Sequence, residues 1–185
     1  MKGTIFVELM NLVERTLGLD AVDQVIDKCG SALSTEGAYT SVGNYPHGEL
    51  LALIGVVSEL APEHADGLLD LFAEALMTTF KQMHPEFFDP QQDYLDFLAS
   101  VETHIHEEVL KLYPDAKPPL IAADRVSPTQ LDLNYKSHRP LAPFSISLAK
   151  AAGKYFAKRV EISVNAASED QRECHFTVTV LGDQV

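Results

Sequence analysis

Apolar residues in the first part of the chain recur every three or four positions, the spacing of an amphipathic helix. This pattern predicts one helix from Ile5 to Leu17 and a second from residue 19 to 30, separated by Gly18. A loop rich in Ser, Thr and Gly is expected over residues 31–46. Further helices are predicted over residues 46–61, 62–85 and 93–113, with a break at the FFDPQQ segment of residues 87–92.

Beyond residue 117 the pattern changes to short, partly alternating segments that are typical of strands. Residues 117–126 and 130–137 predict a hairpin, with SPT as the turn; residues 146–159 predict a helix; residues 159–166 and 174–181 predict two more strands. The expected fold class is therefore α+β, a helical N-terminal part on a mixed C-terminal part with a four-stranded antiparallel sheet. We expect a single domain over residues 1–185, with subdomains at 1–62 and 63–185.

Two histidines, His104 and His106, lie in the predicted helix of residues 93–113. On a strand they would share one face and could bind one metal ion together. On a helix two residues span ~200°, so they point in nearly opposite directions. Apolar residues of this segment fall within a sector of about 120°, which favours the helix. Periodicity does not choose between the histidines, and both could be ordinary half-buried side chains.

The composition of the chain disfavours some classes of binding partner. The chain has 185 residues and a formal net charge of −13, which disfavours nucleic acid and anionic membranes as partners. The two cysteines, Cys29 and Cys174, are far apart in sequence and are expected to be reduced thiols of a cytoplasmic protein. The N-terminal segment does not have the pattern of a signal peptide, and no apolar run is long enough to span a membrane.

A second group of polar residues follows one predicted strand. Tyr135, Ser137 and Arg139 occupy alternate positions of NYKSHRP, so at a strand end they would share one face. Two hydroxyls and a planar guanidinium together suit a carboxylate or a phosphate. The alternative is a polar strand end that faces solvent.

These segments together resemble the H-NOX family, the heme nitric oxide/oxygen binding domains related to the sensor domain of soluble guanylate cyclase. The resemblance covers essentially the whole chain and rests on MKGTIF, GAYTSVGNYP, GELLALIGVVSE, HPEFF, HEEVLKLYPDAKPP, YKSHR and KRVEIS, in that order. The Tyr-x-Ser-x-Arg motif is its most specific part.

The resemblance implies a role for each matched residue. His106, seven residues before the Tyr of LYP, corresponds to the axial ligand of the heme iron, whereas His104 does not match. Tyr135, Ser137 and Arg139 correspond to the residues that hold the heme propionates, and Pro119 to a proline that distorts the heme. The distal and pocket positions correspond to apolar residues: Ile5, Leu9, Leu76, Phe80, Phe144 and Leu148.

The implied cofactor is heme b. Many bacterial relatives also carry a structural zinc bound by three cysteines and a histidine. Here the corresponding positions are Ala142, Val164, Ala167 and Cys174, and one thiol cannot form a closed tetrahedral site. We therefore expect no zinc.

The implied function is a stand-alone, bacterial-type gas sensor without enzymatic activity. It would bind nitric oxide and carbon monoxide, but not oxygen, at a five-coordinate ferrous heme. Nitric oxide would weaken the bond to His106 and release its helix, and a separate histidine kinase, diguanylate cyclase or phosphodiesterase would read the change. The alternative is a heme-binding protein without a signalling role, such as an oxygen carrier or a heme store. A metal-dependent enzyme is disfavoured, because the two histidines do not converge on a helix.

Overall fold

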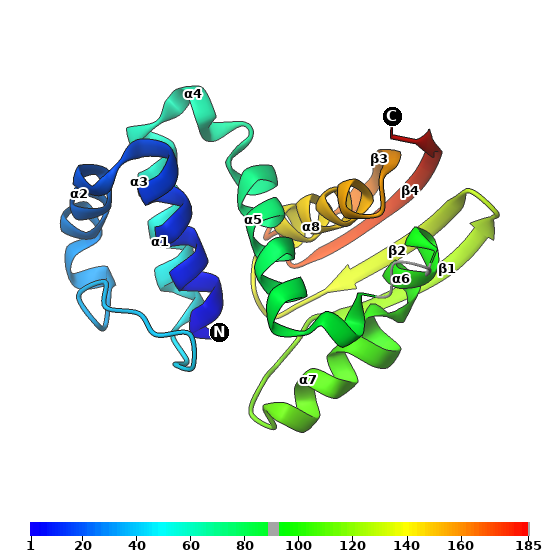
Figure 1. Cartoon of the computed structure of the whole chain (residues 1–185), viewed down its shortest axis with the longest axis horizontal. Helices are drawn as coiled ribbons and strands as arrows, with labels where there is room; N and C mark the ends of the chain where they lie inside the picture. The colour runs from blue at the N-terminus through cyan, green and yellow to red at the C-terminus, as the bar shows by residue number, and fades with distance from the viewer. Residues whose placement is uncertain (89–92, 185) are drawn as a thin grey trace. The chain divides into compact units, whose positions relative to one another are not determined.

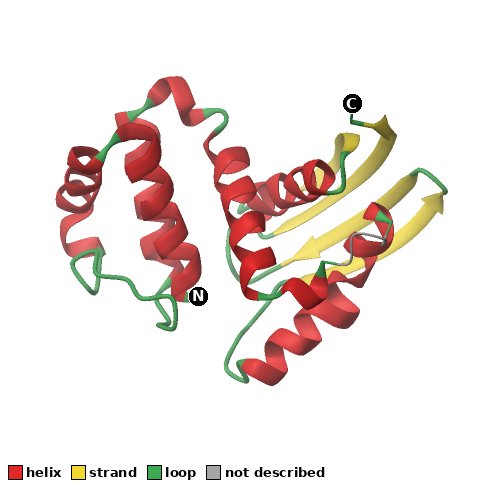
Figure 2. Cartoon of the chain, in the orientation of Figure 1, coloured by secondary structure: helices red, strands yellow, loops and turns green. Residues whose placement is uncertain are grey.

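The computed structural model describes residues 1–88 and 93–184 and separates them into two compact units, Met1–Leu76 and Met77–Val185. The predicted α+β class is confirmed: strands are confined to the second unit and form one four-stranded antiparallel sheet (Figure 2). The boundary between the units falls inside one helix, α5 (Leu68–Met83). The expected boundary between the subdomains, after residue 62, falls at the start of α4. That division stays a prediction.

The N-terminal unit is helical (Figure 1), with α1 (Gly3–Leu17), α2 (Leu19–Cys29), the short 3-10 turn Gly30–Ala32, α3 (His47–Leu60), α4 (Pro62–Ala65) and the first part of α5. Gly18 ends α1 with φ at 90°, a conformation that a glycine adopts without strain. The predicted break between the first two helices is therefore confirmed.

The loop between α2 and α3 is held by a buried carboxylate. Glu49, in the first turn of α3, is only 3% exposed and accepts hydrogen bonds from Ser34 Oγ at 2.6 Å and from the Tyr39 hydroxyl at 2.8 Å. Burial and the adjacent carboxylate raise the pKa of the Tyr39 phenol far above its usual range. The Tyr39 ring also packs with Phe6 and Tyr45, so this loop is ordered against α1.

The C-terminal unit is built on a sheet of strand order β1-β2-β4-β3. Its strands are β1 (Leu120–Ser127), β2 (Gln130–Lys136), β3 (Lys158–Ala167) and β4 (Glu173–Asp183). The buried face alternates along the two central strands, with Leu131 opposite Val178, Leu133 opposite Phe176 and Tyr135 opposite Cys174. This spacing of two is that of strands with one face buried.

Helices cover this inner face. The helix α8 (Ala142–Tyr155) lies along it, and α6 (Tyr94–Ser100) lies beside β1 (Figure 1). The Tyr94 hydroxyl is buried and donates a hydrogen bond to the carbonyl of Ala149 at 2.8 Å, which joins the two helices. Gly153 permits the close approach of α8 to β3, because a Cβ there would lie 3.0 Å from a methyl carbon of Val160.

Several boundaries differ from those predicted. The segment 62–85 is interrupted, since α4 ends at Ala65, α5 begins at Leu68 and the 3-10 turn Pro85–Phe87 follows. Helix α8 begins at Ala142 instead of residue 146. It was predicted to end at residue 159, which is wrong, because α8 ends at Tyr155 and β3 begins at Lys158. Pro143 in the first turn explains the earlier start, because proline fits a helix N-terminus. The predicted break at 87–92 lies partly outside the described residues.

Candidate functional site

His106 lies in a π-helical segment, Val101–His106, that connects α6 with α7 (Glu107–Leu112). The predicted helix over this region is therefore confirmed, but with a wider turn at the histidines. Among the described residues no three His, Cys, Asp or Glu side chains are grouped to bind a metal. Isolated π turns in α-helices occur frequently at functional sites.

Sequence reasoning did not single out Glu102, which contacts both His106 and the sheet. The Nδ1 atom of His106 lies 2.9 Å from Glu102 Oε2, and the same oxygen accepts a hydrogen bond from the Ile121 amide at 3.1 Å. A glutamate four residues before a histidine on a helix is a signal that the sequence did contain. Its second contact, with a residue 19 positions away, could not have been read from spacing.

His104 has a different environment. Its ring stands edge-on against the Phe87 ring, with centroids 5.8 Å apart, and the residue is exposed. His106 is less accessible, with 15% of its side chain exposed. The two histidines therefore differ in burial and in partner, as expected for opposite faces of a helix.

The residues of the Tyr-x-Ser-x-Arg motif lie together, but not all on a strand. Tyr135 belongs to β2 and is buried on the inner face, whereas β2 ends at Lys136. Ser137 follows the strand, and its Oγ accepts a hydrogen bond from the Arg139 backbone N–H at 3.1 Å. The predicted strand alternation therefore does not extend to Arg139, because Ser137 closes a local turn. Burial raises the pKa of the Tyr135 phenol, and a hydrogen bond with Ser137 and the Arg139 charge oppose this.

The guanidinium of Arg139 is partly desolvated. Burial lowers its pKa, and the neighbouring Tyr135 opposes that change. Within residues 1–88 and 93–184 no carboxylate lies within ion-pair distance of this guanidinium. A cation removed from water without an anion beside it is costly unless a ligand supplies the negative charge.

The predicted distal residues form three helical pairs, each separated by four residues. Ile5 and Leu9 lie on α1, Leu76 and Phe80 on α5, and Phe144 and Leu148 on α8, so each pair projects from one helix face. Leu9, Leu76 and Phe144 are buried, and the other three are partly exposed. Ile5, Leu9 and Leu76 belong to the N-terminal unit and the rest to the C-terminal unit.

The donor set fits a heme. Its iron needs a nitrogen ligand, its propionates need cationic and hydroxyl donors, and its ring needs an apolar lining. His106 offers a ring nitrogen whose partner nitrogen is occupied, and Arg139 is a partly desolvated cation beside Tyr135 and Ser137. Pro119 is half-buried and immediately precedes β1, two residues before Ile121.

The positions that correspond to the zinc ligands of relatives belong to α8 and to the paired strands β3 and β4. Ala142 is the buried first residue of α8, Val164 is exposed in β3, and Ala167 lies opposite Cys174 in the β3–β4 register. Burial raises the pKa of the Cys174 thiol, which disfavours the reactive thiolate form. The absence of zinc stays a prediction.

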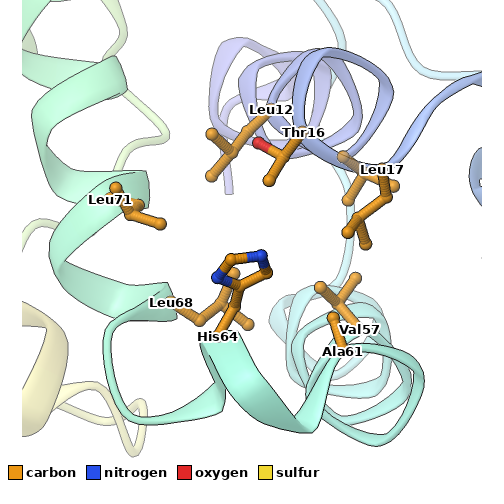
Figure 3. A pocket seen from close by; sticks show the side chains of 9 residues that line it. Leu12, Thr16, Leu17, Val57, Ala61, His64, Leu68 and Leu71 are labelled. Carbon is orange, nitrogen blue, oxygen red and sulfur yellow. The ribbon is translucent and has the colours of Figure 1, made fainter.

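A separate apolar pocket lies within the N-terminal unit (Figure 3). Its walls come from α1, α3, α4 and α5, and the His64 ring is the one ionisable group that lines it. None of the predicted heme-contacting residues lines this pocket.

A family model and several solved structures match this chain, and they point to the same family. The family model described as Haem-NO-binding matches residues 2–164. The Fe(II) unliganded H-NOX protein from K. algicida is 34% identical, with a TM-score of 0.90, over 100% of this chain and 99% of that chain. No curated protein matches the chain.

Two further solved structures are similar. The H-NOX from Shewanella woodyi, solved bound to IWP-051 in the Fe(II)CO state, is 34% identical with a TM-score of 0.80, over 97% of this chain and 94% of that one. The H-NOX protein from S. oneidensis in the Fe(II)NO state is 22% identical with a TM-score of 0.87, over 98% of this chain and 100% of that one, and shows the fold alone.

Proposed function

The chain belongs to the Haem-NO-binding family of H-NOX domains, which are heme-based gas sensors, and from this premise we propose that it senses nitric oxide. In this proposal the cofactor is heme b, His106 is the axial ligand of a five-coordinate ferrous iron, and the protein has no enzymatic activity. When bound, the heme supplies the iron at which a diatomic gas binds.

The observation that carries the proposal is the hydrogen bond between His106 Nδ1 and Glu102. A carboxylate accepts hydrogen bonds, so this contact favours the neutral tautomer with its proton on Nδ1 and its lone pair on Nε2. Metal-binding histidines are commonly held in this way by a carboxylate on the other ring nitrogen. His104, whose ring packs on Phe87, has no such contact among the described residues.

The Tyr-x-Ser-x-Arg residues support the choice of a carboxylate-bearing cofactor. Arg139 would pair with a propionate, while the hydroxyls of Tyr135 and Ser137 would donate to propionate oxygens. The partly buried guanidinium makes this assignment physically favourable, because an anion would compensate its desolvation. Pro119 would contact the ring as the residue that distorts it.

The gas preference is proposed from the distal residues. Ile5, Leu9, Leu76, Phe144 and Leu148 carry no hydrogen-bond donor in their side chains. Nitric oxide and carbon monoxide depend little on such a donor, whereas oxygen is stabilised by one. The carbon monoxide complex of the Shewanella woodyi relative supports the second of these gases as a ligand.

We further propose that a separate histidine kinase or cyclic-di-GMP enzyme reads the ligand state, and that the sensor is cytoplasmic like such partners. None of the described helices is sufficiently long and apolar to cross a membrane. The second candidate is a heme store or oxygen carrier, and a donor-free distal side disfavours the carrier.

Absorption spectroscopy tests the proposal directly. The purified protein is reduced, and spectra are recorded alone and with oxygen, carbon monoxide and nitric oxide. We expect a five-coordinate ferrous spectrum that changes with carbon monoxide and nitric oxide. A protein that takes up no heme, or that holds oxygen stably, would contradict the proposal.

A further inference from the structure

One oxygen atom of Glu102 joins two parts of the C-terminal unit. Glu102 Oε2 lies 2.9 Å from His106 Nδ1 and 3.1 Å from the backbone nitrogen of Ile121. Glu102 and His106 are both in the π-helical segment, whereas Ile121 is the second residue of β1. The Glu102 carboxylate therefore connects the π-helical segment, which carries the predicted iron ligand His106, with the start of β1.

The strand contact occurs at one of the two edges of the sheet. β1 is an edge strand and, within the described residues, pairs with β2 alone, where Ile121 is opposite Tyr135. Backbone N–H groups that point away from the partner strand at such an edge need another acceptor. Glu102 supplies this acceptor for the N–H of Ile121. Ile121 lies two residues after Pro119 and directly opposite Tyr135, the first residue of the Tyr-x-Ser-x-Arg motif.

The histidine contact has an electronic consequence. A carboxylate that accepts from Nδ1 polarises the imidazole and makes Nε2 a stronger donor to a metal. With 33% of the Glu102 side chain exposed, water screens part of this effect, so it should be moderate. The interaction is nevertheless specific, because it fixes both the tautomer and the rotation of the ring.

We propose that Glu102 is a positioning residue for His106: it orients the ring, strengthens its bond to iron and ties it to the β1 segment that follows Pro119. This inference rests on the proposed function, in which His106 ligates the heme iron. If His106 were released from the iron, Glu102 would transmit the change to β1. His106 and the segment that follows Pro119 would then move together.

A purely structural role for Glu102 is the competing explanation. A carboxylate that only caps the edge of β1 would affect folding and the protection of the Ile121 amide, but not the bond between His106 and iron. The two explanations differ in what a neutral, equally shaped side chain does. Because one oxygen accepts both hydrogen bonds, the amide oxygen of a glutamine can accept both as well.

The experiment compares Glu102→Gln and Glu102→Ala with wild type. Glu108→Gln is the matched control, because Glu108 is the same residue type, lies two positions after His106 and pairs with the exposed Lys111. Resonance Raman spectroscopy of the ferrous protein measures the iron–histidine stretching frequency, and a redox titration measures the reduction potential. Hydrogen exchange of the Ile121 amide is measured by NMR on the heme-loaded protein in its Fe(II)CO form.

For Glu102→Gln we expect a lower stretching frequency and a higher reduction potential, with Ile121 protection retained. Glu102→Ala should show both electronic changes, loss of Ile121 protection, and about 10–100-fold weaker heme binding. Glu108→Gln should match wild type. An iron–histidine frequency and potential in Glu102→Gln equal to those of Glu108→Gln would overturn the inference and leave only the edge cap. If the iron ligation in His106→Gly is the same as in wild type, the proposed function itself fails instead.

Discussion

The ring of His104 packs edge to face on the ring of Phe87, with centroids 5.8 Å apart. The ring of His106, two residues later, is instead held through Nδ1 by a carboxylate. One histidine of the pair is thus engaged in aromatic packing and the other has its second nitrogen available. This difference gives the most direct test of the ligand assignment.

We expect His106→Gly to lose the axial bond and to bind heme poorly until imidazole is supplied to fill the space. His104→Gly is the matched control and should leave the ferrous absorption spectrum nearly unchanged, since it removes only a contact with Phe87. Titration of both reduced variants with imidazole measures the rescue. Loss of ligation in the His104 variant alone would show that the assignment is reversed.

Arg139→Ala should accelerate heme loss to a scavenger by about one to two orders of magnitude. A charged hydrogen bond contributes roughly 1.5–3 kcal/mol, and about 1.4 kcal/mol corresponds to a factor of ten. The rate is measured by transfer of heme to an apoprotein in excess. Lys136→Ala is the control, because Lys136 carries the same charge but is 68% exposed and pairs with Glu173. Equal rates in the two variants would remove the propionate role from Arg139.

Local periodicity predicted most of the fold. Helical spacing located α1 to α3, and alternation gave the four strands. It did not predict the gap at Asp66 and Gly67, because the apolar spacing continues across it. The end of α8 was also missed, since the alanines and lysines before Lys158 have a high helix propensity.

The candidate site was only partly accessible to sequence reasoning. Spacing separated His104 from His106 but could not choose between them, and only the family resemblance did so. The apolar pattern did not indicate the π turn, because Val101, Ile105 and Val109 recur at the spacing of an ordinary α-helix. The contact of Glu102 with Ile121 depends on where β1 lies against the helix, which is tertiary information. The turn at Arg139 depends on a Ser137 side chain that could equally have continued the strand.

Gly3 provides a stability test of the N-terminal unit. A Cβ at Gly3 would overlap the carbonyl oxygen of Thr40 and would lie 2.8 Å from a ring carbon of Tyr45. Gly3→Ala should therefore lower the free energy of unfolding by about 1–3 kcal/mol, the usual cost of overpacking. Urea unfolding followed by circular dichroism measures the change.

Gly55→Ala is the control for that variant. Gly55 is exposed in α3, and a Cβ there would meet nothing within 4 Å. The substitution should raise stability by roughly 0.5–1 kcal/mol, because alanine is the better helix former. If both alanines changed stability in the same direction, the close approach of Thr40 to α1 would not be the cause.

The last prediction concerns oxygen. Oxygen in a ferrous heme site gains partial negative charge and is held by a nearby hydrogen-bond donor, which contributes roughly 1.5–3 kcal/mol when charge-assisted. The H-NOX resemblance implies a tyrosine in oxygen-binding relatives at the position of Phe144, five residues after Arg139. A phenyl ring fills a similar volume but donates nothing. We therefore expect the reduced protein to bind nitric oxide and carbon monoxide and to form no stable oxygen complex in air.

Phe144→Tyr examines the cause of this preference. Phe144 is buried in the first turn of α8, so an added hydroxyl needs a partner, and the apolar Leu148 on the same helix would supply none. We expect a gain in oxygen affinity only to the extent that the hydroxyl reaches the bound gas. Tyr94→Phe, which removes a hydroxyl bound to the Ala149 carbonyl, controls for changes in α8 packing and should leave gas selectivity unchanged. Absorption spectra of the reduced wild-type protein in air decide the main question: a long-lived oxygen spectrum would show that a donor exists and that Phe144 does not determine the preference.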